Sequence, residues 1–292
     1  MKPGADEKNK VQGGTLYLVA TPIGNLADLS PRAIKVLSEV DFIAAEDTRN
    51  SLRLLTHFGI SRPLVSYHEH NKRERGEALV ARLLAGESCA LISDAGTPAI
   101  SDPGEDLVVL CAERGVPVSA IPGCCASITA LTLSALPTGR FCFEGFLPMD
   151  KKERRARLSA LASETRTMML HEAPHKLRNT LADLATALGE TRRIALCREL
   201  TKRNEEIQRL TLGEAIAYYE ANEPRGEYVL VVEGGNGCVT DAKNDVLLQL
   251  SPADHVAYYE KQGMRRMDAI KAAAKDRGMQ KNELYRILCE NG

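Results

Sequence analysis

Residues 91–104 read LISDAGTPAISDPG, and this stretch decides the fold that we expect. It starts inside an apolar run, 89–92, which predicts a short buried strand. The chain then enters a loop rich in Ser, Asp, Gly, Thr and Pro, and a helix follows from Glu105, with Asp102 as its predicted N-cap and Pro103 in its first turn. Strand–helix connections usually have about 2–6 residues. Because this one is longer, and because open parallel sheets bind ligands at the carboxyl ends of their strands, we interpret it as a binding loop.

The same alternation of strands and helices extends to both sides of this loop. Apolar runs and turn residues predict strands at 16–20, 41–45, 63–66 and 117–120, and helices at 30–38, 48–57, 71–84 and 105–115. Asn71 followed by Glu74 is the spacing of a capping box. Strands that alternate with helices are typical of βαβ units and predict a mostly parallel sheet.

The second half of the chain repeats this pattern, and the end of the chain departs from it. Strands are expected at 141–143, 167–170, 193–197, 206–210 and 228–232, and helices at 151–161, 174–188 and 213–221. After a glycine-rich linker at 234–237, only helices are expected, at 252–262, 265–277 and 281–290. We therefore predict an α/β fold with a disordered N-terminus (1–13), two α/β domains (14–122 and 123–236) and a small helical tail unit (251–292).

The composition is that of an ordinary globular protein and excludes several function classes. The 292 residues carry a formal net charge of −1, so any nucleic-acid partner must be recognised by a local patch. The eight cysteines form no C-x-x-C pair, and no metal site is expected. The first residues are polar, and no apolar run approaches the roughly 18 residues of a membrane span, so we expect a cytoplasmic protein that does not contact a membrane.

Three polar turns follow predicted strands directly: 21–25, 46–49 and 94–102. Because the carboxyl ends of parallel strands meet at one edge of a sheet, these turns should converge there. Neither a Walker A motif nor G-x-G-x-x-G occurs, so phosphate-loop and dinucleotide-binding functions lack their main support.

At this point the motifs resemble a known family, that of ribosomal RNA small subunit methyltransferase I. The resemblance runs in one order from 14 to 233 and is carried by GTLYLVATPIGNLADLSPRA (14–33), AEDTR (45–49), residues 91–104, PGCCA (122–126), FLP (146–148), HEAPH (171–175), CRELTK (197–202) and GE (226–227). Cys124 and Cys125 stand where the family more often has other small residues. The family belongs to the tetrapyrrole-methylase-like enzymes that use S-adenosylmethionine.

The resemblance implies a fold, a cofactor and a substrate. It implies two α/β domains with S-adenosylmethionine in the cleft between them, usually in a homodimer. It also implies 2′-O-methylation of a cytidine ribose in the decoding region of 16S rRNA, with the 30S subunit as partner. By position, the cofactor-binding residues would be Pro22, Ser93, Asp94, Ala95, Gly96, Thr97, Ile100, Ser101, Pro122, Ala126, Ser127, Glu172, Ala173, Leu200, Gly226 and Glu227.

A ribose hydroxyl is a weak nucleophile and benefits from a base that removes its proton. Glu46 and Asp47 are the first candidates for this base, with Arg49 able to orient a carboxylate or bind a phosphate. Lys202 and Glu199, on the other wall, are the second candidates. The alternative interpretation of 46–49 is a helix N-terminus with favourable acids and Thr48 as cap. His171 and His175 flank a predicted strand–helix turn, and either could be a plain surface residue.

Basic residues gather in the helix at 151–161. Its first turns contain Lys151, Lys152, Arg154, Arg155 and Arg157, which we predict to contact RNA phosphates, although a solvated helix face is the default for such a run. The basic tail unit is a second candidate for RNA or ribosome contact. Two other functions stay open: a methyltransferase of the same fold for a tetrapyrrole or protein acceptor, and a ribosome-binding protein without catalysis.

Overall fold

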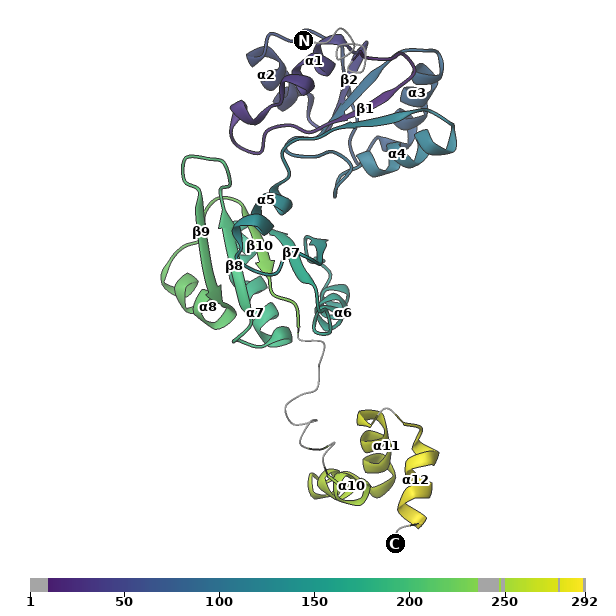
Figure 1. Ribbon diagram of the computed structural model, residues 1–292, viewed down its shortest axis with the longest axis vertical. Helices are drawn as coiled ribbons and strands as arrows, with labels where there is room; N and C mark the ends of the chain where they lie inside the picture. The colour runs from purple at the N-terminus through teal and green to yellow at the C-terminus, as the bar shows by residue number, and fades with distance from the viewer. Residues whose placement is uncertain (1–9, 236–246, 248–249, 278, 291–292) are drawn as a thin grey trace. The chain divides into compact units, whose positions relative to one another are not determined.

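A computed structural model describes residues 10–235, 247, 250–277 and 279–290 (Figure 1). The chain divides into two compact units, residues 1–234 and 235–292. The predicted disordered N-terminus lies in part outside the described residues, but Val11 packs against a core cluster and the Gln12 N–H donates to the Tyr17 hydroxyl. We had expected the folded part of the chain to begin at Gly14, but the contacts of Val11 and Gln12 place its start earlier.

The first sheet of unit 1 is parallel throughout, as predicted. Its strand order is β3-β2-β4-β1-β5, and the strands are β1 (Leu16–Val19), β2 (Phe42–Ala45), β3 (Leu64–Ser66), β4 (Cys89–Ile92) and β5 (Val118–Ile121). The four helices between them are α1 (Pro31–Glu39), α2 (Thr48–His57), α3 (Lys72–Leu84) and α4 (Gly104–Glu113). Every residue of β2 and β4 is buried, because helices cover both faces of the sheet.

The alternation of side chains along each strand assigns the helices to faces. Val19, Ile43 and Ile92 point to one face and pack with residues of α1 and α2, such as Leu37 and Leu55. The other face packs against α3 and α4 through a cluster that comprises Leu16, Phe42, Leu91, Leu79, Leu83 and Leu107. The result is a sheet between two helical layers (Figure 1).

The second sheet, with order β6-β7-β10-β8-β9, is mixed, which the strand–helix alternation did not indicate. Its strands are β6 (Phe141–Gly145), β7 (Thr167–Glu172), β8 (Arg193–Arg198), β9 (Glu206–Thr211) and β10 (Tyr228–Val232). Only β6 and β7 are parallel, while β10 runs antiparallel to both β7 and β8. β8 and β9 are joined directly without a crossover helix, and a parallel pair would need one.

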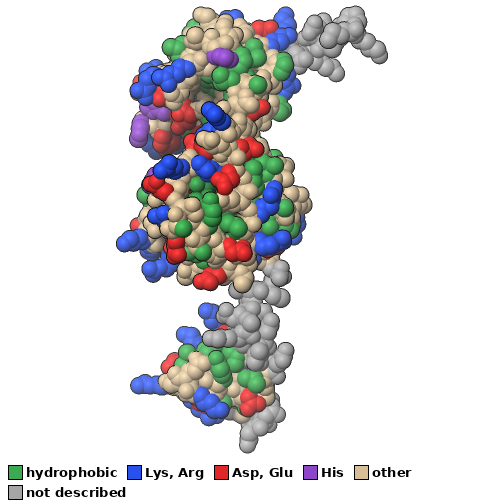
Figure 2. Space-filling view, turned by 90° about the vertical axis from the view of Figure 1, so that its left-hand side faces the viewer, with side chains coloured by type: hydrophobic (Ala, Val, Ile, Leu, Met, Phe, Trp, Pro, Cys, Tyr) green, Lys and Arg blue, Asp and Glu red, His purple; other side chains and the backbone are tan. Residues whose placement is uncertain are grey.

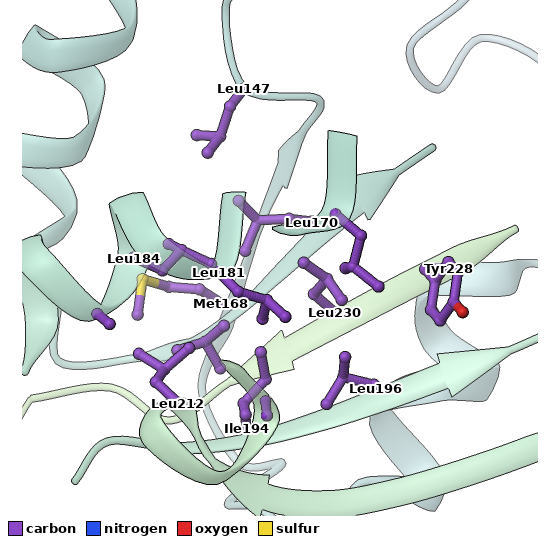
Figure 3. Close-up of a cluster of buried hydrophobic side chains, with 14 of the residues drawn as sticks. Leu147, Met168, Leu170, Leu181, Leu184, Ile194, Leu196, Leu212, Tyr228 and Leu230 are labelled. Carbon is purple, nitrogen blue, oxygen red and sulfur yellow. The ribbon is translucent and has the colours of Figure 1, made fainter. Parts of the chain in front are cut away.

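Helices cover both faces of this second sheet. On one face, α6 (Lys151–Leu161), α7 (Leu177–Leu188) and α8 (Leu212–Ala221) enclose the large apolar cluster of Figure 3, with Met168, Leu196 and Leu230 from the sheet and Leu181 and Leu212 from the helices. On the other face, α5 (Ala126–Leu133) packs on Met169, Val229 and Val231. The first sheet ends with Ile121 and the second begins with Phe141, and the domain boundary at residue 122 stays a prediction.

Two local predictions about helix starts need correction. Asn71 occupies the N-cap position of α3, but its side chain makes no cap hydrogen bond. Instead its Oδ1 accepts from the His68 N–H (2.9 Å) and its amide faces Ser66, so no capping box with Glu74 forms. At α2, the cap is Asp47 rather than Thr48, because the Asp47 carboxylate accepts from the Arg49 N–H.

The second unit contains the three expected helices, α10 (Pro252–Lys261), α11 (Arg266–Asp276) and α12 (Lys281–Glu290). They enclose a small core that includes Val256, Ile270 and Leu284. His255 is fully buried next to Asp276 and accepts from Arg277 Nε, and burial lowers the pKa of its imidazole. Of the predicted linker at 234–237, residues 236 and 237 lie outside the described residues.

Candidate active site

Strand register brings polar residues to the carboxyl edge of the first sheet. Ala45 lies opposite both Ser66 and Ile92, so the residues that follow these three positions leave the sheet side by side. They are Glu46, Tyr67 and Ser93. The predicted convergence of the turns is therefore confirmed, and the turn after β3 joins them.

The loop after β4 is hydrogen-bonded to the turn after β1. The Thr21 N–H donates to the Gly96 carbonyl (2.9 Å) and the Gly96 N–H donates to the Thr21 carbonyl (3.0 Å), while Thr21 Oγ1 donates to the Ser93 carbonyl. Gly96 has a φ of 84°, which glycine adopts without strain. These hydrogen bonds hold the turn after β1 and the loop after β4 together, although the two are distant in the sequence.

Asp102 holds the second half of this loop in shape. Its carboxylate accepts from the Ala99 N–H (2.9 and 3.0 Å) and from the Gly104 N–H (2.7 Å). Ala99 and Ser101 have φ values of 67° and 61°, in the left-handed region that is costly for residues with a side chain. α4 begins at Gly104, so Asp102 lies one residue before the cap position and is not the N-cap that we predicted. Its carboxylate instead links the backbone on the two sides of the loop.

Glu46 and Asp47 are adjacent but differ in their electrostatic environment. Burial raises the pKa of the Glu46 carboxyl, and the charges of Asp94 and Asp102 raise it further. Asp47 is the cap of α2 and binds the Arg49 guanidinium (2.8 Å), and these hydrogen bonds lower the pKa of Asp47 to about 2. A carboxylate with so low a pKa is a weak base, so Glu46 is the better proton acceptor of the two.

The turn after β3 contributes residues that the sequence analysis missed. The Tyr67 hydroxyl, buried beside Glu46 in a small internal cavity, donates to the Pro103 carbonyl (3.0 Å). His68 Nδ1 is buried and has no hydrogen-bond partner among the described residues, while Asn71 Nδ2 lies 3.2 Å from His68 Nε2. The sequence signal was available, because a His-Glu-His-Asn run directly after a strand is rich in groups that bind protons.

The start of α5 closes the first domain against the second. Thr97 Oγ1 donates to the Cys124 carbonyl (2.9 Å), and Gly123 lies so close to Ala20 that a Cβ there would come within 2.8 Å of the Ala20 Cβ. No side chain caps the first amides of α5. Ser127, in its first turn, lies with Oγ 2.9 Å from His171 Nε2, and burial lowers the pKa of His171, so its ring is neutral.

A pocket of about 460 Å³ lies at the junction of the two domains. The first domain contributes Ile23 and Ala95, and α5 contributes Ala126. The second domain supplies the remaining wall, at Phe146, 171–175, Cys197, 199–200, Lys202 and 227–229. Phe146 is 58% exposed and meets His171 edge to face, so an apolar surface with a few polar groups faces the pocket, as in most small-molecule sites.

Lys202 sits between two acids at the rim of this pocket. Its ammonium group lies 2.9 Å from Glu199 Oε1 and 2.7 Å from Glu227 Oε2. Burial alone would lower the pKa of Lys202. The hydrogen bonds that its ammonium group donates to Glu227 and Glu199 outweigh this effect and raise the pKa. Lys202 is therefore charged and cannot accept a proton.

Comparisons with known proteins now give the family. Residues 15–216 match the model of the Tetrapyrrole (Corrin/Porphyrin) Methylases. Ribosomal RNA small subunit methyltransferase I of Halalkalibacterium halodurans is 48% identical over 98% of this chain and 99% of its own length, and that of Escherichia coli O157:H7 is 46% identical over 95% of both. The chain belongs to the ribosomal RNA small subunit methyltransferase I family.

Solved structures show that the fold is shared more widely than the sequence. Diphthine synthase has a TM-score of 0.57 at 14% identity, covering 75% of this chain and 90% of that chain. Uroporphyrin-III-C-methyltransferase from Thermus thermophilus has a TM-score of 0.54 at 19% identity, covering 75% of this chain and 94% of that chain. The tetrapyrrole methylase type of α/β fold that we predicted is confirmed.

The predicted cofactor residues of this family member differ in whether they line this pocket. Those that line the pocket are Ala95, Ala126, Glu172, Ala173, Leu200 and Glu227. Pro22 and Asp94 line a neighbouring pocket beside α2, and Ser93 lies at the internal cavity beside Glu46. The remaining ones, Gly96, Thr97, Ile100, Ser101, Pro122, Ser127 and Gly226, do not line the pocket. Ile23, Pro174, Cys197 and Val229 line it and were not predicted.

Two of the predicted cofactor residues have roles that differ from a simple cofactor contact. The Glu172 carboxylate is buried and accepts from Thr180 Oγ1 and from the Ala173 N–H, so it is held inside the second domain. Gly226 has a φ of 81°, and a Cβ there would lie 2.6 Å from the Glu199 Cγ. Gly226 is therefore needed for the close approach that places Glu199 and Lys202.

The basic residues of α6 differ in whether their charges are paired with acids of the protein. Arg154 binds Asp183 (2.6 Å) and Thr180, and Arg157 lies 3.4 Å from Glu144. Lys151, Lys152 and Arg155 form no ion pair among the described residues. Across the face in Figure 2, acidic and basic side chains are mixed, so any RNA contact depends on local groups of free cations.

The described part of the chain contains neither a cluster of metal-ligating side chains nor a helix that could span a membrane. No group of three or more His, Cys, Asp or Glu residues there could hold a metal ion. No helix in that part is long and apolar enough to span a bilayer.

Proposed function

We propose that this methyltransferase transfers a methyl group from S-adenosylmethionine to the 2′-oxygen of a cytidine ribose in the decoding region of 16S rRNA. The observation that carries the proposal is the pocket at the domain junction, in a chain whose relatives named for small-subunit rRNA methylation match it along nearly its whole length. The homodimer that the resemblance implies stays a prediction, which sedimentation can check.

The residues around the pocket fit such a cofactor. The uncapped amides of α5 are free to receive a carboxylate, and Ala126 lies at the pocket wall. The apolar side chains of Ile23, Leu200 and Val229 suit an adenine ring, and backbone groups at 172–173 and 227–228 offer polar contacts for its edge. When bound, S-adenosylmethionine supplies an electrophilic methyl group on a sulfonium.

Glu46 is the residue that we assign to proton removal from the ribose hydroxyl. Its raised pKa brings its basicity closer to that of a useful general base, and it lies beside Ser93, two residues before Ala95 at the cofactor pocket. Glu46 would accept the proton of the hydroxyl whose oxygen takes the methyl group that bound S-adenosylmethionine would supply.

Arg49 and Lys202 are assigned supporting roles. Asp47 fixes the Arg49 guanidinium by two hydrogen bonds, and the side chain of Arg49 is 87% exposed, so it can meet a phosphate of the substrate. Lys202, charged and held by Glu199 and Glu227, positions the wall of the cofactor pocket.

The other functions receive weaker support. The likeness to uroporphyrin-III-C-methyltransferase and diphthine synthase rests on fold alone at 14–19% identity, so it does not favour a tetrapyrrole or protein acceptor. A ribosome-binding protein without catalysis would not need the carboxylate-rich edge beside the cofactor pocket.

The test is methyl transfer to 30S subunits that lack the modification. Labelled S-adenosylmethionine, digestion of the rRNA to nucleosides and mass spectrometry should identify 2′-O-methylcytidine, with a Glu46→Gln variant as the matched control. We expect this isosteric variant to bind the cofactor normally and to lose about 10²–10⁴-fold in turnover. Methylation of a base, of a protein or of a tetrapyrrole would overturn the proposal. Cofactor binding without transfer to RNA would favour the non-catalytic alternative.

The helical tail unit is proposed to contact the 30S subunit. It folds around its own small core and presents exposed basic residues, among them Arg265, Lys271 and Lys275. Removal of 251–292 should weaken methylation of 30S subunits and leave calorimetric cofactor affinity intact. Unchanged methylation would refute this role.

A further inference from the structure

A second hollow, of about 750 Å³, lies between α6 and α7. From α6 it is lined at Lys151, Arg155 and Ser159, and from α7 at Asn179, Asp183 and Ala187. Each series advances by four residues, which is the spacing of one helix face. The hollow is therefore a groove that follows both helices for about two turns, or roughly 12 Å.

One end of the groove carries more positive charge than it can neutralise internally. Its basic residues are Lys151, Arg154, Arg155 and Lys176, and its one acid is Asp183. Arg154 forms an ion pair with Asp183 and so neutralises the charge of that acid. Lys151, Arg155 and Lys176 form no ion pair with any described residue, and Asp150 nearby is engaged as the cap of α6. Free cations in a concave site attract a polyanion.

The other end of the groove is small and largely apolar. Leu158, Ala182 and Ala187 form this part, with Ser159 and Thr186 as neutral polar neighbours. A groove with unpaired cations at one end and an apolar lining at the other matches a single nucleic-acid strand, which has a charged backbone and weakly polar bases.

Two chain segments lead from this groove to the cofactor pocket. Phe146 lines the pocket and Pro148 and Met149 line the groove. In the same way, Pro174 and His175 line the pocket and Lys176 lines the groove, where its ammonium group contacts the Met149 sulfur. The cationic end of the groove is thus the end beside the pocket.

From these observations we propose that the α6–α7 groove binds a single-stranded segment of the substrate RNA through its phosphates and guides the strand to the methylation site. The inference rests on the proposed function for the identity of the RNA. It adds Lys176 to the RNA contacts and leaves out Arg154 and Arg157, whose charges are used inside the protein.

The experiment compares two triple variants of the full chain with equal loss of charge. The groove variant is Lys151→Gln, Arg155→Gln and Lys176→Gln. The control is Lys10→Gln, Arg75→Gln and Arg140→Gln, three exposed cations that lie outside the groove and lack an ion pair among the described residues. Binding of a fluorescent single-stranded rRNA oligonucleotide and of 30S subunits is measured over a range of KCl concentrations.

We expect the groove variant alone to lose affinity. Loss of three phosphate contacts should reduce the slope of log K against log salt by about 2, since each contact on a single strand contributes about 0.7. A third variant, Ala182→Phe, keeps every charge and fills the groove at an exposed position, and it should also weaken binding. Cofactor affinity and melting temperature should match those of the wild type in all three.

Several results would overturn the proposal that the groove binds RNA and would leave the proposed function unaffected. These are equal losses in both triple variants, full affinity in the groove variant, or an undisturbed affinity in Ala182→Phe. Competition by poly-glutamate as effective as that by RNA would also overturn it, in favour of an acidic protein partner. Failure of the proposed function would be recognised separately, because wild-type protein would then bind RNA through the groove but transfer no methyl group to it.

Discussion

Replacement of Asp102 by Ala should loosen the loop at 93–104 and destabilise the first domain. The carboxylate accepts from two backbone N–H groups, those of Ala99 and Gly104, at 2.7–3.0 Å. Hydrogen bonds to a charged group contribute about 1.5–3 kcal/mol each. Water can replace part of this at a half-buried site, so the loss should lie near the lower end, at about 2–4 kcal/mol.

The strained backbone of the loop favours its loosening in the variant, and the release of this strain offsets part of the stability that is lost with the hydrogen bonds. Ala99 and Ser101 keep left-handed conformations that cost roughly 1–2 kcal/mol each. Once the hydrogen bonds to Asp102 are gone, the loop relaxes to conformations without this strain. The relaxed loop no longer offers the Gly96 groups that bind Thr21, so cofactor affinity falls together with stability.

Urea unfolding followed by circular dichroism, with hydrogen exchange of the Ala99 and Gly104 amides, measures both effects. Asp102→Asn is the matched variant, since it keeps one acceptor oxygen, and it should lose about half as much. If Asp102→Ala kept wild-type stability and amide protection while turnover collapsed, Asp102 would be a chemical participant and our interpretation of the loop would be wrong.

Further predictions concern the other side chains of the site. Gly96→Val should weaken S-adenosylmethionine binding by about tenfold in calorimetry, because its φ of 84° disfavours a β-branched residue, whereas Gly59→Val, at φ 67° with open space around it, should not. Asp94→Ala should also lower this affinity, since Asp94 accepts from the Asp47 N–H (3.2 Å); unchanged binding would argue against its role. Arg49→Ala should lower kcat more than cofactor affinity, and NMR titration should find the pKa of Asp47 moved up from about 2. The pH profile of kcat should rise through the raised pKa of Glu46, because only its ionised form accepts a proton, and Glu46→Gln should abolish that limb.

The first domain could be predicted almost completely from the chain because its central strands β2 and β4 are fully buried and each strand is followed by a helix. Such runs as Phe42–Ala45 have no exposed face, and only a parallel sheet covered on both sides explains them. The same reasoning failed for the second sheet. Strands 193–198 and 206–211 are also separated by turn residues, but whether two strands pair as a hairpin depends on long-range partners, which local patterns do not contain.

Within the site, sequence patterns predicted the loops better than the partners of single side chains. Asn71 has the spacing of a cap, yet its amide donates to the Ser66 carbonyl and its side-chain oxygen accepts from the His68 N–H, so neither group caps its own helix. The arginines of α6 looked equivalent to its lysines, but Arg154 reaches Asp183 from another helix. Each of these outcomes follows from a contact between distant segments, which is decided only when the fold has formed.

The junction between the domains depends on positions that have no side chain at all. A Cβ at Gly24 would lie 2.4 Å from the Lys202 Cγ, and one at Gly226 would lie 2.6 Å from the Glu199 Cγ. Both glycines therefore press backbone from one segment against the ion pair that borders the cofactor pocket. A methyl group at either position must displace Lys202 or Glu199, and the two acids around Lys202 would then lose the cation that compensates their charges. The pocket is thus held in shape by close backbone approach as much as by polar contacts.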